Sequence, residues 1–344
     1  MSDPVEVFAL EAGGSSPEQT RSRRRRVIEV ADGLVLSTIL MYALYVPNRT
    51  AVQASIALWA PKVIASPIEQ KLAFATTSDS VRIAYATTGA GPAVVSVLGW
   101  ATHLENGLMS PVYDTDGLLP MTSSNFYYVR YDGRGFGLSD RKIDDFSIEA
   151  RVRDIEAVVD AAGLERFALY AQSAGGPAAI VYTARHPDRV SRLVLASTMA
   201  SSGYIDAQRR ARFLRVLDLV ETDWQSPPVS NLFVEILFPG NQDDVSQRIF
   251  SEFLRRAADG PQVAGFMRAQ LDTDVTEQAR QVSVPTLVIH ARDDSTVNLE
   301  AGRELASLVP GARFEIIDGN HREGTGNAVA SRRRILEFLS EATW

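Results

Sequence analysis

Short apolar runs alternate with helix-length amphipathic segments along most of the chain after residue 71. Uninterrupted apolar runs of this kind are typical of strands that are buried on both faces of a parallel sheet. Strands are predicted at 72–77, 81–87, 93–98, 126–131, 167–171, 192–196, 285–290 and 313–317. The first two strands should form a hairpin, because Ser78-Asp79-Ser80 between them favours a turn.

The segments between the later strands repeat their apolar residues at helical spacing. Ile148, Val152 and Ile155, for example, fall on one face of a helix predicted over 147–162. Further helices are predicted over 299–309 and 331–339. Alternating strands and helices predict an α/β fold, with a mostly parallel central sheet flanked by helices.

This alternation is interrupted between residues 201 and 281, where no strand is predicted. The helical runs there are 206–219, 229–237, 244–258 and 260–271. Because the segment lies between two strands of the sheet, we expect a helical lid over the sheet edge, with 71–200 and 282–344 forming the α/β core. The lid should contribute apolar side chains to a pocket, with these candidates: Phe213, Leu217, Phe233, Leu237 and Phe253.

Residues 1–70 do not follow the α/β pattern and form a predicted N-terminal extension. Residues 1–26 are polar, end in an arginine-rich run and indicate a disordered basic segment. Apolar helices are predicted after it, at about 30–46 and 50–60.

Three interpretations of this apolar stretch remain open. It packs on the main domain or a second subunit, it contacts or enters a membrane, or it is a cleaved export signal. The uncharged part, 33–46, is shorter than the ~20 residues that span a bilayer. Residues 21–66 are therefore a candidate surface for a homo-oligomer or for a membrane, and the expected location is the cytoplasm unless that segment directs otherwise.

The amino-acid composition excludes several kinds of partner and catalytic group. The chain has 344 residues, with 45% apolar and 22% charged residues and a net charge of −7, so nothing indicates a nucleic-acid partner. The absence of Cys excludes disulfides, thiolate nucleophiles and Cys-ligated zinc. Four His are present, at 103, 186, 290 and 321.

A candidate nucleophile lies in the run F-A-L-Y-A-Q-S-A-G-G-P, which begins at Phe167. A strand, a sharp turn with Ser173 at its tip and a helix are the context of a nucleophile elbow. The positions two before and two after Ser173 must be small, because the turn is strained and the strand and helix pass close together. Ala171 and Gly175 meet this requirement.

A serine hydroxyl is a weak nucleophile and needs a base that is held by a third group. In this topology the acid and the histidine follow the serine, each on a loop after a later strand. His321 follows the strand 313–317, and it is the predicted base. Asp294, after the strand 285–290, is preferred to its neighbour Asp293 as the acid.

The loop after the strand 93–98 should lie beside the serine. The backbone N–H of Trp100 and that of Ala174, the residue after the nucleophile, are the predicted oxyanion donors. His103 in the same loop is a candidate substrate contact, together with Phe213 and Phe233 of the lid. Trp100 could instead be a core aromatic residue in a plain turn.

The glycine-rich run 131–140 does not fit a dinucleotide-binding motif, because its glycines alternate as G-x-G-x-G. We interpret the run as a set of tight structural turns that carry Arg134 beneath the active-site loops.

Together these motifs resemble the α/β-hydrolase superfamily over roughly residues 71–344. The runs L-G-W-A-T-H-L-E, Y-D-G-R-G-F-G-L-S-D, A-Q-S-A-G-G and V-P-T-L-V-I-H-A-R-D-D are similar to esterase-type hydrolases and to the hydrolase modules beside bacterial nucleotide-cyclase domains. The resemblance implies Ser173, Asp294 and His321 as nucleophile, acid and base, and no cofactor. The sequence departs from the family pattern at Ala171 and Ala291, where Gly is usual.

The expected activity is hydrolysis of a small-molecule carboxylic ester with an apolar group, through an acyl-enzyme. Cleavage of a carbon–carbon bond, lactone or amide, and acyl transfer, would use the same residues, because fold does not determine substrate. A non-catalytic ligand sensor with the hydrolase fold is the alternative from another class.

Overall fold

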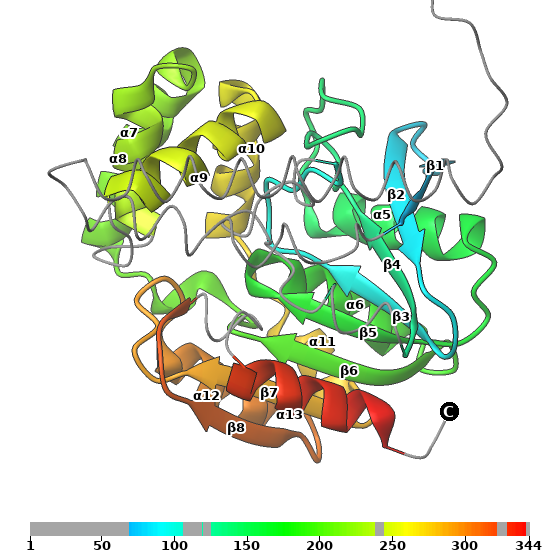
Figure 1. The fold of residues 1–344 in the computed structure, drawn as a ribbon. Helices are drawn as coiled ribbons and strands as arrows, with labels where there is room; N and C mark the ends of the chain where they lie inside the picture. Colours follow the sequence, from blue (N-terminus) through cyan, green and yellow to red (C-terminus); the bar gives the residue numbers. More distant parts are fainter. Residues whose placement is uncertain (1–68, 106–118, 120–124, 238–243, 322–328, 342–344) are drawn as a thin grey trace, which may run out of the picture. The chain divides into compact units, whose positions relative to one another are not determined.

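A computed structural model describes residues 69–105, 119, 125–237, 244–321 and 329–341 (Figure 1). Within them, an eight-stranded sheet has the order β1-β2-β4-β3-β5-β6-β7-β8. β1 pairs with β2 and β2 with β4 in antiparallel fashion, and the other neighbours are parallel. The mostly parallel sheet predicted from the sequence is confirmed.

The strand boundaries follow the apolar runs closely. The strands are β1 (Lys71–Thr76), β2 (Arg82–Thr88), β3 (Ala93–Val97), β4 (Tyr127–Tyr131), β5 (Phe167–Gln172), β6 (Val190–Ala196), β7 (Thr286–Ala291) and β8 (Arg313–Ile317). In the central strand β5, Leu169 and Ala171 face one hydrophobic cluster, whereas Ala168 and Tyr170 face another. Both faces of the sheet are therefore buried, which is why these strands are apolar without interruption.

Helices cover both faces. On one face lie α5 (Ile148–Ala161), α6 (Gly176–Arg185), α11 (Thr276–Gln281) and α12 (Leu299–Leu308), and on the other lies α13 (Val329–Ser340). The hydroxyl of Ser147 caps α5 by accepting a hydrogen bond from the N–H of Ala150 at 3.2 Å. The helical layers place the C-terminal ends of the parallel strands at one edge of the domain, where the loops can meet.

Of the five described α-helices between β6 and β7, four form a separate group. They are α7 (Ala207–Asp223), α8 (Pro227–Leu237), α9 (Asp244–Ala257) and α10 (Gly260–Leu271), and Figure 1 shows them gathered away from the sheet. The buried residues Leu217, Phe233 and Phe253 give them a hydrophobic cluster of their own, which also includes Trp100 and Phe136. This helical insertion is thus packed onto the loops that follow β3 and β4.

The helical insertion closes on itself within the predicted segment 201–281. Its two ends meet at an isolated bridge between Ser201 and Asp274, and the N–H of Val275 donates to the carbonyl of Ala200 at 2.8 Å. α11 follows this closure and packs against α6 and α12. The sequence pattern could not separate α11 from the insertion, because its helical spacing does not show which layer it joins.

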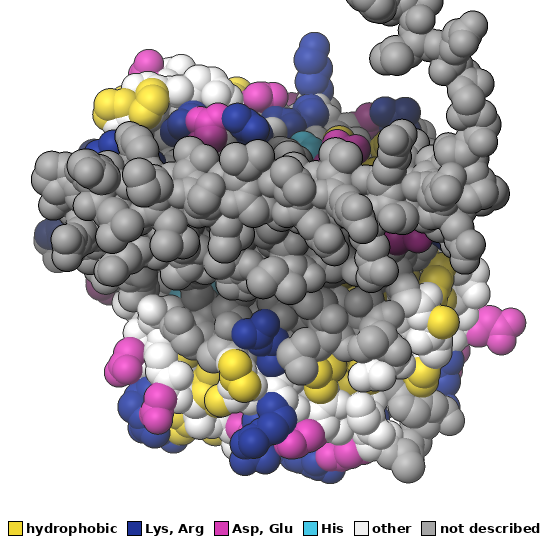
Figure 2. Space-filling model, in the orientation of Figure 1, with side chains coloured by type: hydrophobic (Ala, Val, Ile, Leu, Met, Phe, Trp, Pro, Cys, Tyr) yellow, Lys and Arg dark blue, Asp and Glu magenta, His cyan; other side chains and the backbone are white. Residues whose placement is uncertain are grey.

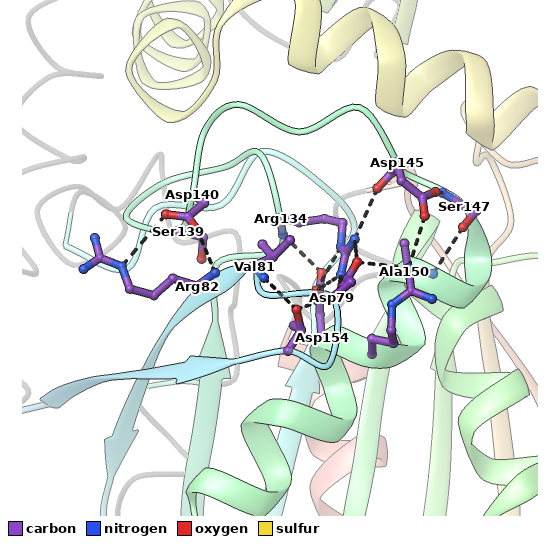
Figure 3. A network of polar contacts seen from close by, with 12 residues as sticks. Asp79, Val81, Arg82, Arg134, Ser139, Asp140, Asp145, Ser147, Ala150 and Asp154 are labelled. Carbon is purple, nitrogen blue, oxygen red and sulfur yellow. Dashed lines mark hydrogen bonds and ion pairs between the residues drawn. The ribbon is translucent and has the colours of Figure 1, made fainter.

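A buried arginine ties the hairpin to the rest of the core (Figure 3). Arg134 forms ion pairs of 2.9 Å with Asp79 in the β1–β2 turn and 2.9 Å with Asp154 in α5. The hydrogen bond from Arg134 holds the pKa of Asp79 well below its usual range. Burial raises the pKa of Asp154 to about 6, and its contacts with Arg134 oppose that rise.

The glycine-rich run forms tight turns around the buried carboxylate of Asp132. The N–H of Leu138 donates to Asp132 Oδ2 at 2.9 Å. Gly137 has a φ of 52°, and a Cβ at that position would lie 2.1 Å from the same oxygen. The glycines of this run therefore permit close backbone packing, in agreement with the structural interpretation.

The predicted elements of residues 1–68 lie outside the described residues. None of the described helices has both the length and the apolar character needed to cross a bilayer.

Candidate active site

The turn after β5 holds Ser173 in a strained conformation. Ser173 has a φ of 50°, which costs an L-residue roughly 1–2 kcal/mol. A short 3₁₀ turn, η1 (Ser173–Gly175), follows and leads directly into α6. The sharp reversal places the half-buried Ser173 side chain at the C-terminal end of the sheet.

Small residues after Ser173 are required by contacts with neighbouring strands. A Cβ on Gly175 would lie 2.3 Å from the carbonyl oxygen of Val97, and one on Gly176 would lie 2.1 Å from Thr198 Oγ1. The Thr198 hydroxyl also donates to the carbonyl of Ser173 at 2.5 Å. β3, the turn and the segment after β6 are therefore in direct contact around Ser173.

The three residues expected to form the triad are hydrogen-bonded in series. Ser173 Oγ lies 3.0 Å from His321 Nε2, and His321 Nδ1 lies 2.7 Å from Asp294 Oδ2. These distances suit a hydroxyl that donates to Nε2 and an Nδ1–H that donates to a carboxylate. The fold brings together side chains that are 148 and 27 residues apart in the sequence.

Asp294 lies in a buried site that favours its ionised form. Burial raises the pKa of the carboxyl group, but the contacts with His321, His290 and the Val297 N–H together hold the pKa below its ordinary value. The other oxygen accepts hydrogen bonds from the N–H groups of Thr296 at 3.0 Å and Val297 at 2.9 Å. Asp293, by contrast, is exposed.

A second histidine adjoins this carboxylate. The Nε2–H of His290 donates to the carbonyl of Val297 at 2.9 Å, and Nε2 lies 3.5 Å from Asp294 Oδ2. Burial lowers the pKa of His290, so its ring is neutral at pH 7. His290 therefore combines a local hydrogen bond to the backbone with a position beside Asp294.

The loop after β3 passes beside Ser173, as expected for a loop that supplies an oxyanion donor. A Cβ on Gly99 would lie 3.1 Å from Ser173 Cβ. The buried Ala101 has a φ of 49°, so the backbone reverses sharply just after Trp100. Trp100 and Ala174 both line the cavity that opens at Ser173.

That cavity has a volume of about 350 Å³ and lies between the core loops and the helical insertion. Its lining is mainly apolar and includes Trp100, Met199, Phe213, Val216, Leu237, Met267 and Leu271. A volume of this size is typical of small-molecule sites, which range from about 300 to 1,000 Å³.

Of the lid residues predicted to face a pocket, Phe213 and Leu237 line this cavity, whereas Leu217, Phe233 and Phe253 are buried in the insertion. Phe233 is fully buried behind it, stacked on Phe213 at 6.0 Å and edge-on to Trp100 at 5.5 Å. His103 is not among the lining residues and lies within the electrostatic influence of Asp132 and Glu105. Helical spacing placed Phe213 and Phe233 in the insertion, but only packing decided which ring faces the cavity.

Arg151 of α5 is a contact that the sequence analysis missed. Its Nη1 donates to the carbonyl of Ala174 at 3.0 Å and to Gln270 Oε1 of α10 at 3.1 Å. Burial lowers the pKa of Arg151 to about 10, so it remains charged at neutral pH. Arg151 connects the insertion to the turn that carries Ser173. No sequence signal marked this contact, because Glu149, Arg153 and Asp154 lie close to Arg151 in α5.

Comparison with known proteins agrees with this arrangement. A family model described as alpha/beta hydrolase fold matches residues 92–322. The non-heme haloperoxidase of Rhodococcus erythropolis is 27% identical over 279 residues, which cover 77% of this chain and 98% of that protein. The 2-hydroxymuconate semialdehyde hydrolase of Pseudomonas putida is 30% identical over 227 residues, which cover 61% of this chain and 76% of that protein.

A similar solved structure is that of a hydrolase from Pseudomonas aeruginosa. It has a TM-score of 0.66 and 28% sequence identity, and the match covers 78% of this chain and 98% of that chain.

Proposed function

The chain belongs to the α/β-hydrolase family, and from this premise we propose that it hydrolyses carboxylic esters with Ser173 as the nucleophile. Asp294 and His321 act as the acid and the base of a catalytic triad. The observation that carries the proposal is the continuous hydrogen-bonded series from Ser173 Oγ through the His321 ring to Asp294.

Acylation begins when Ser173 Oγ attacks the ester carbonyl carbon and its proton passes to His321 Nε2. The Asp294 carboxylate stabilises the imidazolium that forms and keeps Nδ1 protonated. The negative charge on the former carbonyl oxygen is stabilised by the N–H groups of Trp100 and Ala174. Collapse of this intermediate breaks the bond to the alcohol, which leaves with the proton from His321.

Deacylation repeats these steps with water. His321 Nε2 removes a proton from a water molecule, whose oxygen attacks the acyl carbon of the ester to Ser173. The acid is released, and Ser173 recovers its proton from His321. One ester and one water give one acid and one alcohol, and no redox partner is required.

Two features support an ester as the substrate. His321 can act first as base and then as acid, and an alcohol leaving group needs only that one proton transfer. The largely apolar cavity at Ser173 is suited to the carbon skeleton of an acyl or alcohol group.

The proposal is tested with a fluorophosphonate probe and with p-nitrophenyl esters of increasing acyl length. Wild type should be labelled and should release p-nitrophenol, whereas Ser173→Ala should do neither. Ser307→Ala is the matched control, because Ser307 is exposed, does not line the cavity and donates its hydroxyl hydrogen bond to the carbonyl of Glu304 in its own helix. Absence of labelling in folded wild type would overturn the proposal and favour a non-catalytic ligand sensor.

A further inference from the structure

One face of α7 carries two arginines toward the cavity. Arg209, Arg212, Phe213 and Val216 line it, and their spacing of three, four and seven residues places them on one stripe of the helix. The first two turns of α7 therefore present two guanidinium groups, and the apolar side chains of Phe213 and Val216 follow along the same stripe. The cavity lining is polar and positive at one end and apolar along the rest.

The charge at that end is not balanced. The described residues that line the cavity include Arg209 and Arg212 but no Asp or Glu. Arg209 Nη2 donates to the carbonyl of Ser295 at 3.2 Å, and within the described part of the chain neither arginine forms an ion pair.

Two other arginines of the insertion, which do not line the cavity, form ion pairs. Arg210 pairs with Asp272 at 2.5 Å. Arg268 of α10 pairs with Asp218 at 2.9 Å and with Glu221 at 2.7 Å. Carboxylates thus neutralise Arg210 and Arg268. Arg209 and Arg212, which are exposed at the cavity, have no such partner among the described residues.

Polar side chains adjoin the same end. Ser202 and Tyr204 line the cavity next to the first turn of α7, and the Tyr204 hydroxyl donates to the carbonyl of Thr296 at 3.3 Å. Arg209 lies close enough to Tyr204 to influence the charge on its hydroxyl group electrostatically. This end can therefore hold a charged group in a hydrogen-bonding environment.

We propose that the substrate of this site carries a carboxylate on an apolar carbon skeleton, and that Arg209 and Arg212 bind the carboxylate. A guanidinium presents a planar fork of donors that matches a carboxylate, and it remains charged at all relevant pH values. This inference rests on the proposed function, since the ester must reach Ser173 while the anion occupies the arginine end. The substrate class is an ester with a second, ionised carboxyl group.

Pairs of anionic and neutral esters of matched size test whether the site prefers a negatively charged substrate. For the acyl side, the p-nitrophenyl monoester of adipic acid is compared with p-nitrophenyl hexanoate. For the alcohol side, the hexanoate ester of 4-hydroxybenzoic acid is compared with phenyl hexanoate. A higher kcat/KM for the anionic member of either pair supports the proposal and shows which side of the ester faces the arginines.

The double variant Arg209→Gln/Arg212→Gln should lose about tenfold in kcat/KM for the anionic ester, as expected for lost hydrogen bonds with a charged group. Its loss of kcat/KM for the neutral ester should be much smaller, so that the ratio between the two esters changes. Arg215→Gln is the matched control, because Arg215 lies on α7, is exposed and does not line the cavity. Raising NaCl to about 0.5 M should weaken the preference in wild type only.

A binding measurement separates this inference from the proposed function. In the Ser173→Ala background, calorimetry compares monomethyl adipate with dimethyl adipate, and neither needs to be hydrolysed. Tighter binding of the anionic compound, lost in the added arginine double variant, supports the inference even if ester hydrolysis is not observed. Equal binding of the two compounds, or equal losses for anionic and neutral esters in the double variant, would overturn it.

Discussion

At the scale of single residues, two adjacent aspartates have opposite surroundings. Asp294 is buried and receives hydrogen bonds from His321, Thr296 and Val297, whereas Asp293 is exposed. Three hydrogen-bond donors fix the Asp294 carboxylate, so it can hold the imidazole in one orientation. We therefore propose Asp294 as the triad acid and no chemical role for Asp293.

This assignment predicts a large difference between two similar variants. Asp294→Asn should lower kcat by about 10³- to 10⁴-fold, because a carboxamide neither stabilises the imidazolium nor enforces the required tautomer. Asp293→Asn should leave kcat nearly unchanged. Steady-state hydrolysis of a p-nitrophenyl ester measures both, and comparable losses in the two variants would refute the assignment.

At the scale of elements, the turn between β5 and α6 is shaped by lack of space rather than by glycine conformation alone. Gly175 has an ordinary φ of −75°, yet the carbonyl oxygens of Val97 and Leu98 lie 2.3 and 2.6 Å from the position of an added Cβ. Gly163 is the opposite case, with a φ of 68° and nothing within 4 Å of such a Cβ. Gly175 is therefore required by lack of space for a Cβ, and Gly163 by its positive φ.

Substitution by alanine should distinguish these constraints. Gly175→Ala should push the turn away from β3, destabilise the fold by about 1–3 kcal/mol and slow fluorophosphonate labelling of Ser173. Gly163→Ala should cost about 1 kcal/mol through backbone strain and leave the labelling rate unchanged. Urea unfolding and labelling kinetics provide the two measurements; a Gly175→Ala protein that matched wild type in both would contradict this account of the turn.

At the scale of the whole molecule, the described part of the surface in Figure 2 shows acidic and basic side chains interspersed. The buried charges are arranged differently, because Arg134 has only 1% exposure and lies between Asp79 and Asp154. Removing a partner from such a buried pair leaves an uncompensated charge. This network connects the β1–β2 hairpin, the glycine-rich turn and α5, so its loss should affect the global stability.

Arg134→Met should lower the free energy of unfolding by about 3 kcal/mol at pH 7. Arg185→Met, which breaks the exposed pair of Arg185 with Glu149, should lower it by less than about 1 kcal/mol. Urea denaturation of both variants measures the difference, and equal losses would show that the buried network is not a special source of stability.

The contribution of the Arg134–Asp79 ion pair to the free energy of unfolding should depend on pH. The folded-state pKa of Asp79 is lowered by Arg134, so the stability from this contact is present above the ordinary Asp pKa and is lost as the pH falls below it. The advantage of wild type over Arg134→Met should therefore be largest at neutral pH and shrink in acid. An advantage that grew as the pH fell would contradict the assigned direction of the pKa shift.

The sequence by itself determined the layered α/β core and the residues available for chemistry. Continuous apolar runs specify strands buried on both faces, and every predicted strand lies within two residues of an observed one. The order of Ser173, Asp294 and His321 after successive strands also predicted that they would meet, because the C-terminal ends of parallel strands share one edge of the sheet.

Only the tertiary structure decided how neighbouring side chains divide between core and cavity. Helical spacing gives a stripe of residues but not the surface that the stripe faces, so Phe213 and Phe233 looked alike in the sequence and Arg209 and Arg212 gave no signal. The boundary before α11 and the contact of Arg151 with Gln270 were likewise hidden. These features depend on packing between segments far apart in the chain, which local sequence pattern does not encode.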